Sequence, residues 1–388
     1  MPIPKPSHDP LDRMAARLAD LERHDRLRSV YVASGVDLCS NDYLGLSRHP
    51  LLKGALQDAV GQMTRVSSTG SRLLSGHHPI WDELEDEFAA FAGTEAALYF
   101  GSGFAANLGL LSSVLNVDDV VFSDALNHAS LIDGTRLARC RKVIYPHCDL
   151  DFLEDELKRC AHSDGSGAKL IVTESIFSMD GDRAPLRELF QLGERYGARL
   201  IVDEAHATAT CGWQGRGLTA DFGLQNQALA VVHTCGKALA GAGAFVCGSK
   251  ILKQFLVNHA RSFIFSTGMP PYFGLQIRAA LRLAAGMDAE RDYLAALSAK
   301  LRDSLRSEGF DCGQSNSHIV PLIVQGNGEV VHLAEILRER GFAVKAIRSP
   351  SVPPGRERLR LSCTADVSAE EIERFVDIVS KERVALGA

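Results

Sequence analysis

Apolar runs and helical patterns alternate along much of the chain. Short apolar runs, typical of buried strands, are separated by segments whose apolar residues recur every three or four positions, as in helices. The predicted strands cover 97–100, 119–123, 142–145, 169–173, 199–202, 229–233 and 244–247. The predicted helices start near residue 104 and cover 129–139, 152–160 and 185–196. This alternation predicts an α/β protein built from βαβ units, with a mostly parallel central sheet between helices.

The two ends of the chain have a different pattern. Residues 11–28 combine helical spacing with many charges, which predicts an exposed amphipathic helix before a short strand at 37–40. The other predicted elements lie at 80–92, 271–307, 317–324, 330–340, 343–347, 358–362 and from 369. We therefore expect three parts: an N-terminal helix and strand segment (1–45), a large domain (46–280) and a smaller C-terminal α+β domain (281–388).

The composition is that of an ordinary globular protein. Of 388 residues, 46% are hydrophobic and 23% are charged, which excludes a disordered or collagen-like chain. The net charge of −6 gives no basic bias, so we expect no nucleic-acid partner. The nine cysteines are scattered without a C-x-x-C pair, which argues against a disulfide framework or structural zinc. We expect reduced thiols, a cytoplasmic location and no bound metal.

One uncharged segment, 96–117, is about as long as a membrane-spanning helix. It contains glycines, serines and asparagines, and it fits a strand, a glycine turn and a buried helix. We therefore expect no membrane association.

The first candidate site is the turn Gly101-Ser102-Gly103, which follows a predicted strand and opens a helix. The free N–H groups and positive dipole end of a helix N-terminus suit a phosphate. The pattern also fits G-x-G-x-x-A, with Asp124 about 20 residues further on, as in a dinucleotide site. A tight turn without any ligand is a third interpretation.

Two further candidates follow predicted strands. Asp203 ends an apolar run, with His206 three residues later, and Lys237 lies in a glycine-containing turn 34 residues beyond Asp203. Alone, each has an ordinary explanation: a helix cap, a surface histidine and a solvated lysine. Together with the phosphate turn, the set meets the needs of pyridoxal 5'-phosphate (PLP), because a lysine amine binds its aldehyde and a carboxylate keeps its pyridine nitrogen protonated. A nicotinamide cofactor would leave the lysine and the aspartate without a role.

Four motifs resemble the α-oxoamine synthases, which are fold-type I PLP-dependent transferases. They are S-N-D-Y-L-G-L at 40–46, E-S-I-F-S-M-D-G-D at 174–182, D-E-A-H at 203–206 and T-C-G-K at 234–237. The resemblance covers most of the chain, from about Arg28 to Thr364. It implies PLP as the cofactor.

The resemblance also implies roles for four catalytic residues. Lys237 would bind the cofactor covalently and remove the α-proton, and Asp203 would pair with the pyridine nitrogen. His206 would hydrogen-bond to the phenolic oxygen of the ring. His128 would stack on the ring face, and its alternative is a cap on the following helix.

Further cofactor contacts follow from the same resemblance. The phosphate would be held by the side chain of Thr234 and by the backbone of Ser102, Gly103 and Phe104. Ser178 would contact the ring oxygen or the acyl group. Thr267 would reach the phosphate from a second subunit, which implies a homodimer with shared active sites; the alternative is an ordinary loop threonine.

Substrate contacts are expected from Arg360, Asn41 and Arg28. Arg360 matches the arginine that binds the amino-acid carboxylate, where two parallel N–H donors suit a carboxylate, and Asn41 would assist it. A surface arginine on a strand is the alternative. Arg28, or less favourably Arg26, would meet the distal carboxylate of a dicarboxylic acyl chain.

Within the family, the chain most resembles the members that condense L-alanine with pimeloyl-CoA or a pimeloyl-carrier protein in biotin biosynthesis. The segment from Ser71 to His78 carries this finer likeness. Glycine C-acetyltransferase, 5-aminolevulinate synthase and serine palmitoyltransferase are the alternatives, because they share the cofactor residues. Two positions depart from the family: Ala209 stands where glycine is usual, and Ser351 where threonine is common.

Overall fold

The structure is a computed structural model that describes residues 9–161 and 167–382. The chain divides into two compact units. Unit 1 contains 9–40, Met179–Gly181 and 295–382, and unit 2 contains 41–161, 167–178 and Asp182–Leu294. The three-part division expected from the sequence, with boundaries after residues 45 and 280, stays a prediction.

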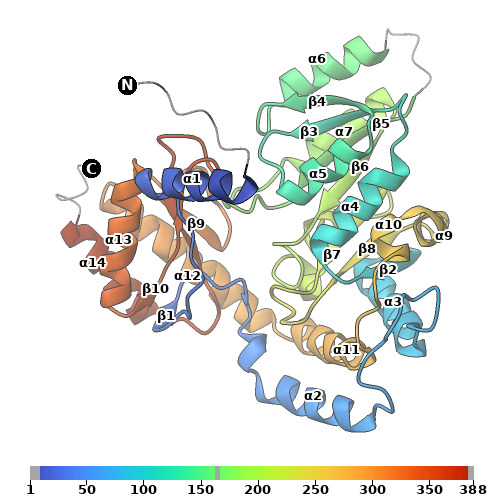
Figure 1. Ribbon diagram of the computed structural model, residues 1–388, viewed down its shortest axis with the longest axis horizontal. Coiled ribbons are helices and arrows are strands. Elements are labelled where there is room, and N and C mark those ends of the chain that lie inside the picture. The colour runs from blue at the N-terminus through green and yellow to red at the C-terminus, as the bar shows by residue number, and fades with distance from the viewer. Residues whose placement is uncertain (1–8, 162–166, 383–388) are drawn as a thin grey trace. The chain divides into compact units, whose positions relative to one another are not determined.

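Unit 2 is built on one large sheet (Figure 1). Its strands are β2 (Ala96–Phe100), β3 (Val120–Asp124), β4 (Arg141–Tyr145), β5 (Lys169–Glu174), β6 (Ala198–Asp203), β7 (Ala230–Thr234) and β8 (Ala244–Gly248). In the described part of the chain, the strand order is β2-β8-β7-β6-β5-β3-β4. Strand β8 is antiparallel to both of its neighbours, and the other pairs are parallel. The predicted mostly parallel α/β sheet is thus confirmed.

Helices cover both faces of this sheet. The described helices of unit 2 are α2 (Pro50–Gln62), α3 (Pro79–Ala92), α4 (Gly103–Val114), α5 (Ala129–Leu137), α6 (Leu150–Ala161), α7 (Leu186–Tyr196), α8 (Leu218–Asp221), α9 (Lys250–His259), α10 (Arg261–Ile264) and α11 (Pro271–Ala285), with short 3₁₀ turns η1 (Leu46–Arg48) and η2 (Trp213–Gly215). On one face, α4, α5, α9 and α10 bury apolar side chains against the strands. On the other, Phe88 of α3 stacks on Phe245 of β8 with ring centroids 4.0 Å apart.

Unit 1 is the smaller α+β part. Its elements are α1 (Pro10–Arg23), β1 (Val36–Asp37), β9 (Ile319–Ile323), α13 (Asn327–Glu339), β10 (Phe342–Ala343), β11 (Ala346–Ile347), β12 (Arg358–Ser362) and α14 (Ala369–Glu382). Helix α12 (Asp288–Ser307) begins in unit 2 and continues into unit 1. Strands β11, β12 and β9 form an antiparallel sheet, and β1 pairs with β10 in parallel.

Three predicted elements need correction. The helix expected at 11–28 ends at Arg23, since Asp25 has a positive φ of 53° and Arg26 N–H already bonds to the Leu21 carbonyl, so Arg28 lies in a non-helical segment. The stretch 271–307 is two helices, α11 and α12, because α11 ends at Ala285 and is capped by Gly286. The strand expected at 343–347 is two short strands, β10 and β11, in different sheets.

Two general properties follow from the described residues. None of the described helices has the length and apolar character needed to cross a membrane. All nine cysteines are free thiols.

Candidate active site

Three neighbouring strands of the unit 2 sheet end in an acidic residue. Strands β6, β5 and β3 are adjacent, and their last residues are Asp203, Glu174 and Asp124. Because these strands are parallel, the three carboxyl groups lie along the same edge of the sheet. This is the edge at which open α/β sheets bind ligands.

Asp203 is buried, with 5% of its surface exposed. Its Oδ2 accepts a hydrogen bond from Asn107 Nδ2 at 2.6 Å, and its Oδ1 accepts one from Ala205 N–H at 2.8 Å. Both donors are neutral, so within the described residues this carboxylate has hydrogen bonds but no salt-bridge partner. A buried carboxylate in this state suits a cationic group brought by a ligand.

Glu174, at the end of the next strand, is fully enclosed. Burial raises the pKa of Glu174 to about 8; the neighbouring charge of Asp203 also raises it, and Lys237 opposes the rise. The backbone N–H groups of His128 and Ser178 donate to its side chain. The protonated form of Glu174 therefore predominates at neutral pH, which spares the site a second negative charge beside Asp203.

Asp124 is paired by the protein itself. His147 lies between two carboxylates, with Nδ1 at 2.9 Å from Asp124 Oδ1 and Nε2 at 2.7 Å from Asp182 Oδ2. Burial opposes the charge of His147, but hydrogen bonds to both aspartates raise its pKa to about 12. Asp124, His147 and Cys148 are also spaced as metal ligands, yet both ring nitrogens of His147 are taken. Asp124 is therefore engaged in an internal ion pair, which argues against its role as the acidic residue of a dinucleotide site.

Lys237 lies at the end of a chain of polar contacts. Its Nζ is 2.8 Å from His206 Nε2, and His206 Nδ1 is 2.6 Å from the hydroxyl of Tyr43, which donates to Asn41 Oδ1 at 2.9 Å. Since the Tyr43 proton goes to Asn41, its oxygen accepts from Nδ1–H of His206. Nε2 of His206 is then the atom that accepts from Lys237. The structure thus brings together Lys237, His206 and Asn41, which the sequence predicted separately.

His128 caps the N-terminus of α5. Its Nδ1 accepts from Ser130 N–H at 3.2 Å and lies 2.7 Å from Ser130 Oγ. Burial lowers the pKa of His128, and the charge of Asp203 opposes this, so the ring is neutral at neutral pH. The structure therefore shows His128 as the helix cap, while its stacking on a cofactor ring stays a prediction.

The residues predicted to hold a phosphate lie at the start of α4 and the end of β7. Ser102 caps α4, its Oγ accepting from Ala105 N–H at 3.0 Å, so the first-turn N–H groups of Gly103 and Phe104 have no partner inside the helix. A Cβ on Gly103 would meet Thr234 Oγ1 at 2.8 Å, so the glycine lets this helix start lie directly beside Thr234. Phosphate binding by these donors stays a prediction.

Two other predicted contacts lie in unit 2. Ser178 is buried, and its backbone N–H donates to Glu174. Thr267 is exposed on a loop after α10, where it forms an isolated antiparallel bridge with Ser71. Its contact with a second subunit stays a prediction.

The predicted substrate arginines belong to unit 1. Arg360 is buried on β12 and its Nη1 donates to Ser362 Oγ at 2.6 Å. Arg28 is exposed and its Nη2 donates to Ser351 Oγ at 2.7 Å, while Arg26 Nη2 lies 3.4 Å from Ser349 Oγ. The contact links Arg28 with Ser351, the position at which threonine was expected.

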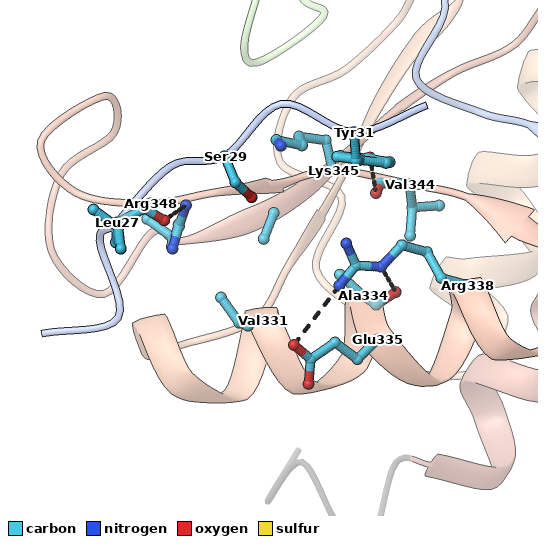
Figure 2. A pocket seen from close by; sticks show the side chains of 11 residues that line it. Leu27, Ser29, Tyr31, Val331, Ala334, Glu335, Arg338, Val344, Lys345 and Arg348 are labelled. Atoms are coloured by element: carbon cyan, nitrogen blue, oxygen red, sulfur yellow. Dashed lines mark hydrogen bonds and ion pairs between the residues drawn. The ribbon is translucent and has the colours of Figure 1, made fainter. Parts of the chain in front are cut away.

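A cavity of about 230 Å³ in unit 1 lies beside the segment that carries Arg28 (Figure 2). Figure 2 shows Arg338 paired with Glu335 on α13, Lys345 beside Tyr31, and Arg348 near Leu27 and Ser29. Burial lowers the pKa of Arg348, and the charge of Arg28 lowers it too. Positive charge therefore predominates around this part of unit 1.

Ala209, where glycine was expected, has the glycine-like backbone. Its φ is +66° and it is buried, so the left-handed conformation costs about 1 kcal/mol relative to a right-handed one. Its N–H donates to Gly215 O at 2.7 Å and its carbonyl accepts from Arg291 Nη1 at 3.3 Å. These bonds keep the turn after His206 in place.

Four residues of this site were missed in the sequence. Tyr43 and Glu174 lie inside recognised motifs but had no assigned role. Asn107 is a single amide on an otherwise apolar helix, and Ser130 follows His128 by two residues. A buried polar residue on an apolar face was the available signal for Asn107.

The sequence matches the aminotransferase class I and II family over residues 33–379. The chain belongs to this family. It is 43% identical, over 341 residues, to the 8-amino-7-oxononanoate synthase of Anaeromyxobacter dehalogenans, covering 88% of this chain and 84% of that protein.

Two solved structures are similar over nearly the whole chain. A serine palmitoyltransferase from S. paucimobilis, described with bound PLP, has a TM-score of 0.89 at 26% identity and covers 98% of this chain and 100% of that one. The 8-amino-7-oxononanoate synthase of Francisella tularensis has a TM-score of 0.78 at 28% identity, and the alignment covers 90% of this chain and 98% of that one. The predicted resemblance to α-oxoamine synthases and the fold-type I architecture are confirmed.

Proposed function

We propose that the chain is an 8-amino-7-oxononanoate synthase that uses PLP to join L-alanine to a pimeloyl thioester with loss of CO₂. Curated relatives with this name are between 40% and 44% identical over most of the chain. The serine palmitoyltransferase structures align closely but share only 26% to 28% of residues. Identity to the solved structures does not separate the two reactions, because the 8-amino-7-oxononanoate synthase of Francisella tularensis is also 28% identical. The names of the curated relatives are what favours the alanine-specific reaction.

The observation that carries the proposal is the state of Asp203. It is buried and held by two neutral donors, one of them Asn107 of α4, and the charges of Asp203 and Lys237 both act on the pKa of Glu174. A protonated pyridine nitrogen would supply the missing positive partner. The lysine, the acid and the phosphate turn together fit PLP and leave none of the three without a role.

When bound, PLP supplies an aldehyde for the lysine and a ring that delocalises the electron pair left on the α-carbon. Lys237 Nζ would hold the cofactor through the aldehyde, and the same amine would be the base that takes the α-proton. His206 Nε2, which accepts from Nζ at 2.8 Å, holds this amine in position. Asp203 would keep the pyridine nitrogen protonated, and neutral His128 would stack on the ring.

Arg360 binds the carboxylate of L-alanine, with help from Asn41. Held in this way, the amino acid would present its α C–H bond to Lys237. Arg28, in its positively charged surroundings, receives the distal carboxylate of the pimeloyl chain. Ser178 contacts the ring oxygen or the incoming acyl group.

The active unit is a cytoplasmic homodimer in which Thr267 of one subunit contacts the phosphate bound by the other. The nine free thiols agree with a reducing compartment. Mixing Lys237→Ala and Thr267→Ala protomers should give hybrid sites that differ from either parent. An active monomer in sedimentation would contradict the dimer.

The test of substrate is kcat/KM for L-alanine, glycine and L-serine, each with pimeloyl-, succinyl-, acetyl- and palmitoyl-CoA. L-Alanine with pimeloyl-CoA should be the best pair. One methyl group discriminates by roughly 10- to 200-fold, so glycine should be a poor substrate. If glycine with succinyl-CoA were best, the substrate assignment would be wrong, although the PLP assignment would stand.

A further inference from the structure

We propose that Asn107 is a positioning residue that holds the carboxylate of Asp203 and the ring of His128 in one hydrogen-bonded unit. This inference rests on the proposed function. Asn107 lies on α4, one turn after Gly103, and is 1% exposed. Its Nδ2 is 2.6 Å from Asp203 Oδ2 and 2.9 Å from Ser130 Oγ.

The direction of each hydrogen bond follows from chemistry. An ionised carboxylate only accepts, so the atom facing Asp203 is the amide nitrogen, which has two protons to donate. One proton goes to Asp203 and the other to Ser130 Oγ. Ser130 then donates its own proton to His128 Nδ1, 2.7 Å away, and Nε2 of the neutral imidazole carries the ring proton.

The cost of this arrangement points to a role other than stability. Asn107 Oδ1 is buried and has no hydrogen-bond partner within the described residues. An unsatisfied buried acceptor is unfavourable, and most neighbours of Asn107 on α4 are apolar. An apolar side chain would avoid the penalty, but it would supply neither donor.

The consequence is a fixed carboxylate. Asn107 holds Oδ2 and Ala205 N–H holds Oδ1, so the plane of Asp203 is set from both oxygens. The same amide sets His128 through Ser130. The group that meets the pyridine nitrogen and the group that lies against the ring are thus positioned by one side chain.

The experiment compares Asn107→Ala, Asn107→Asp and Asp203→Ala, alone and combined, in reconstituted full-length protein. Two quantities are measured: the PLP dissociation constant from the cofactor absorbance, and exchange of the α-proton of L-alanine with deuterated water. Asn107→Ala should weaken PLP binding and slow exchange by roughly 10- to 100-fold, with the KM for L-alanine changed less than about threefold. Asn107→Asp keeps the volume but loses both donors, so its effect should be at least as large.

The double variant separates positioning from a general packing defect. If Asn107 acts through Asp203, Asn107→Ala should have almost no further effect on PLP affinity in the Asp203→Ala background. Ser130→Ala removes only the hydrogen bonds that connect Asn107 to His128. It should slow exchange of the α-proton while leaving PLP affinity near wild type. Thr135→Val on α5, which deletes a buried hydroxyl bonded to Ile132 O, is the control and should change neither quantity.

The outcomes distinguish the two proposals. A wild-type protein that binds no PLP would overturn the proposed function. Normal PLP binding in the wild type, with Asn107 variants matching it or with effects that add fully to those of Asp203→Ala, would overturn the role of Asn107 alone. If Asn107→Ala does not fold, Asn107→Asp and Ser130→Ala decide the question by the same measurements.

Discussion

The ends of β6 and β3 present the same residue type at the same edge of one sheet. Asp203 ends β6 and Asp124 ends β3, with β5 between them. Asp124 is paired with His147, whereas Asp203 has only neutral donors in the described part of the chain. Among the described residues, the protein supplies a positive partner to Asp124 and none to Asp203.

Glu174, at the end of the strand between them, shows a third solution. Burial raises its pKa to about 8, so this carboxyl is mostly protonated rather than paired. The comparison teaches that acidity at a strand end does not by itself mark an active site. The mark is a buried carboxylate whose hydrogen bonds are complete and whose charge is not yet balanced.

The largest effect should come from Asp203→Asn. An amide cannot hold the pyridine nitrogen in its protonated form, so removal of the α-proton from L-alanine should slow by roughly 10²- to 10³-fold. Hydrogen–deuterium exchange at the α-carbon measures this step directly. Exchange at the wild-type rate would contradict the role of Asp203 and leave no functional difference between Asp203 and Asp124.

Asp124→Asn should have the opposite profile. It leaves the imidazolium of His147 with one carboxylate instead of two, which should lower the free energy of unfolding by about 3 kcal/mol. The kcat of the folded enzyme should stay within about threefold of wild type. A loss of kcat comparable to that of Asp203→Asn, without a loss of stability in urea, would place Asp124 in the active site.

The pairing of Asp124 also predicts a pH dependence. Hydrogen bonds to Asp124 and Asp182 outweigh burial and raise the pKa of His147 to about 12, above its ordinary value of 6.5. The resulting stability is complete below about pH 6.5 and is lost as the pH rises toward 12. The stability advantage of wild type over His147→Gln should therefore shrink between pH 7 and 9, by up to about 1.4 kcal/mol per pH unit. Urea unfolding of both proteins across this range tests the sign; an advantage that grows with pH would mean that His147 is neutral.

Local pattern was enough to predict much of the sheet and to select the candidate cofactor residues. Strand ends, a glycine turn and a lysine are signals within a few residues, and they led to Asp203, Lys237 and the start of α4. The antiparallel direction of β8 could not be predicted, because a buried apolar run looks the same in either direction. Helix α2 was missed, and its two glycines, Gly54 and Gly61, weaken the helical signal.

The contacts that organise the site join distant parts of the sequence. Tyr43 meets His206 across 163 positions, and Asn107 meets Asp203 across 96. No spacing rule links such pairs, so the sequence predicted the reacting groups but not the side chains that hold them. The end of α1 at Arg23 was missed for a different reason: it depends on the positive φ of Asp25, which the helical spacing of apolar residues does not indicate.

The measurement that tests the account most directly is borohydride reduction of the PLP-reconstituted protein, followed by peptide mapping. The account predicts a yellow protein with the cofactor fixed on Lys237. Lys237→Ala should lose the covalent label, and Lys250→Ala, which changes an exposed lysine at the start of α9, should keep it. A label on another lysine, or a colourless protein that does not respond to added PLP, would contradict the central claim.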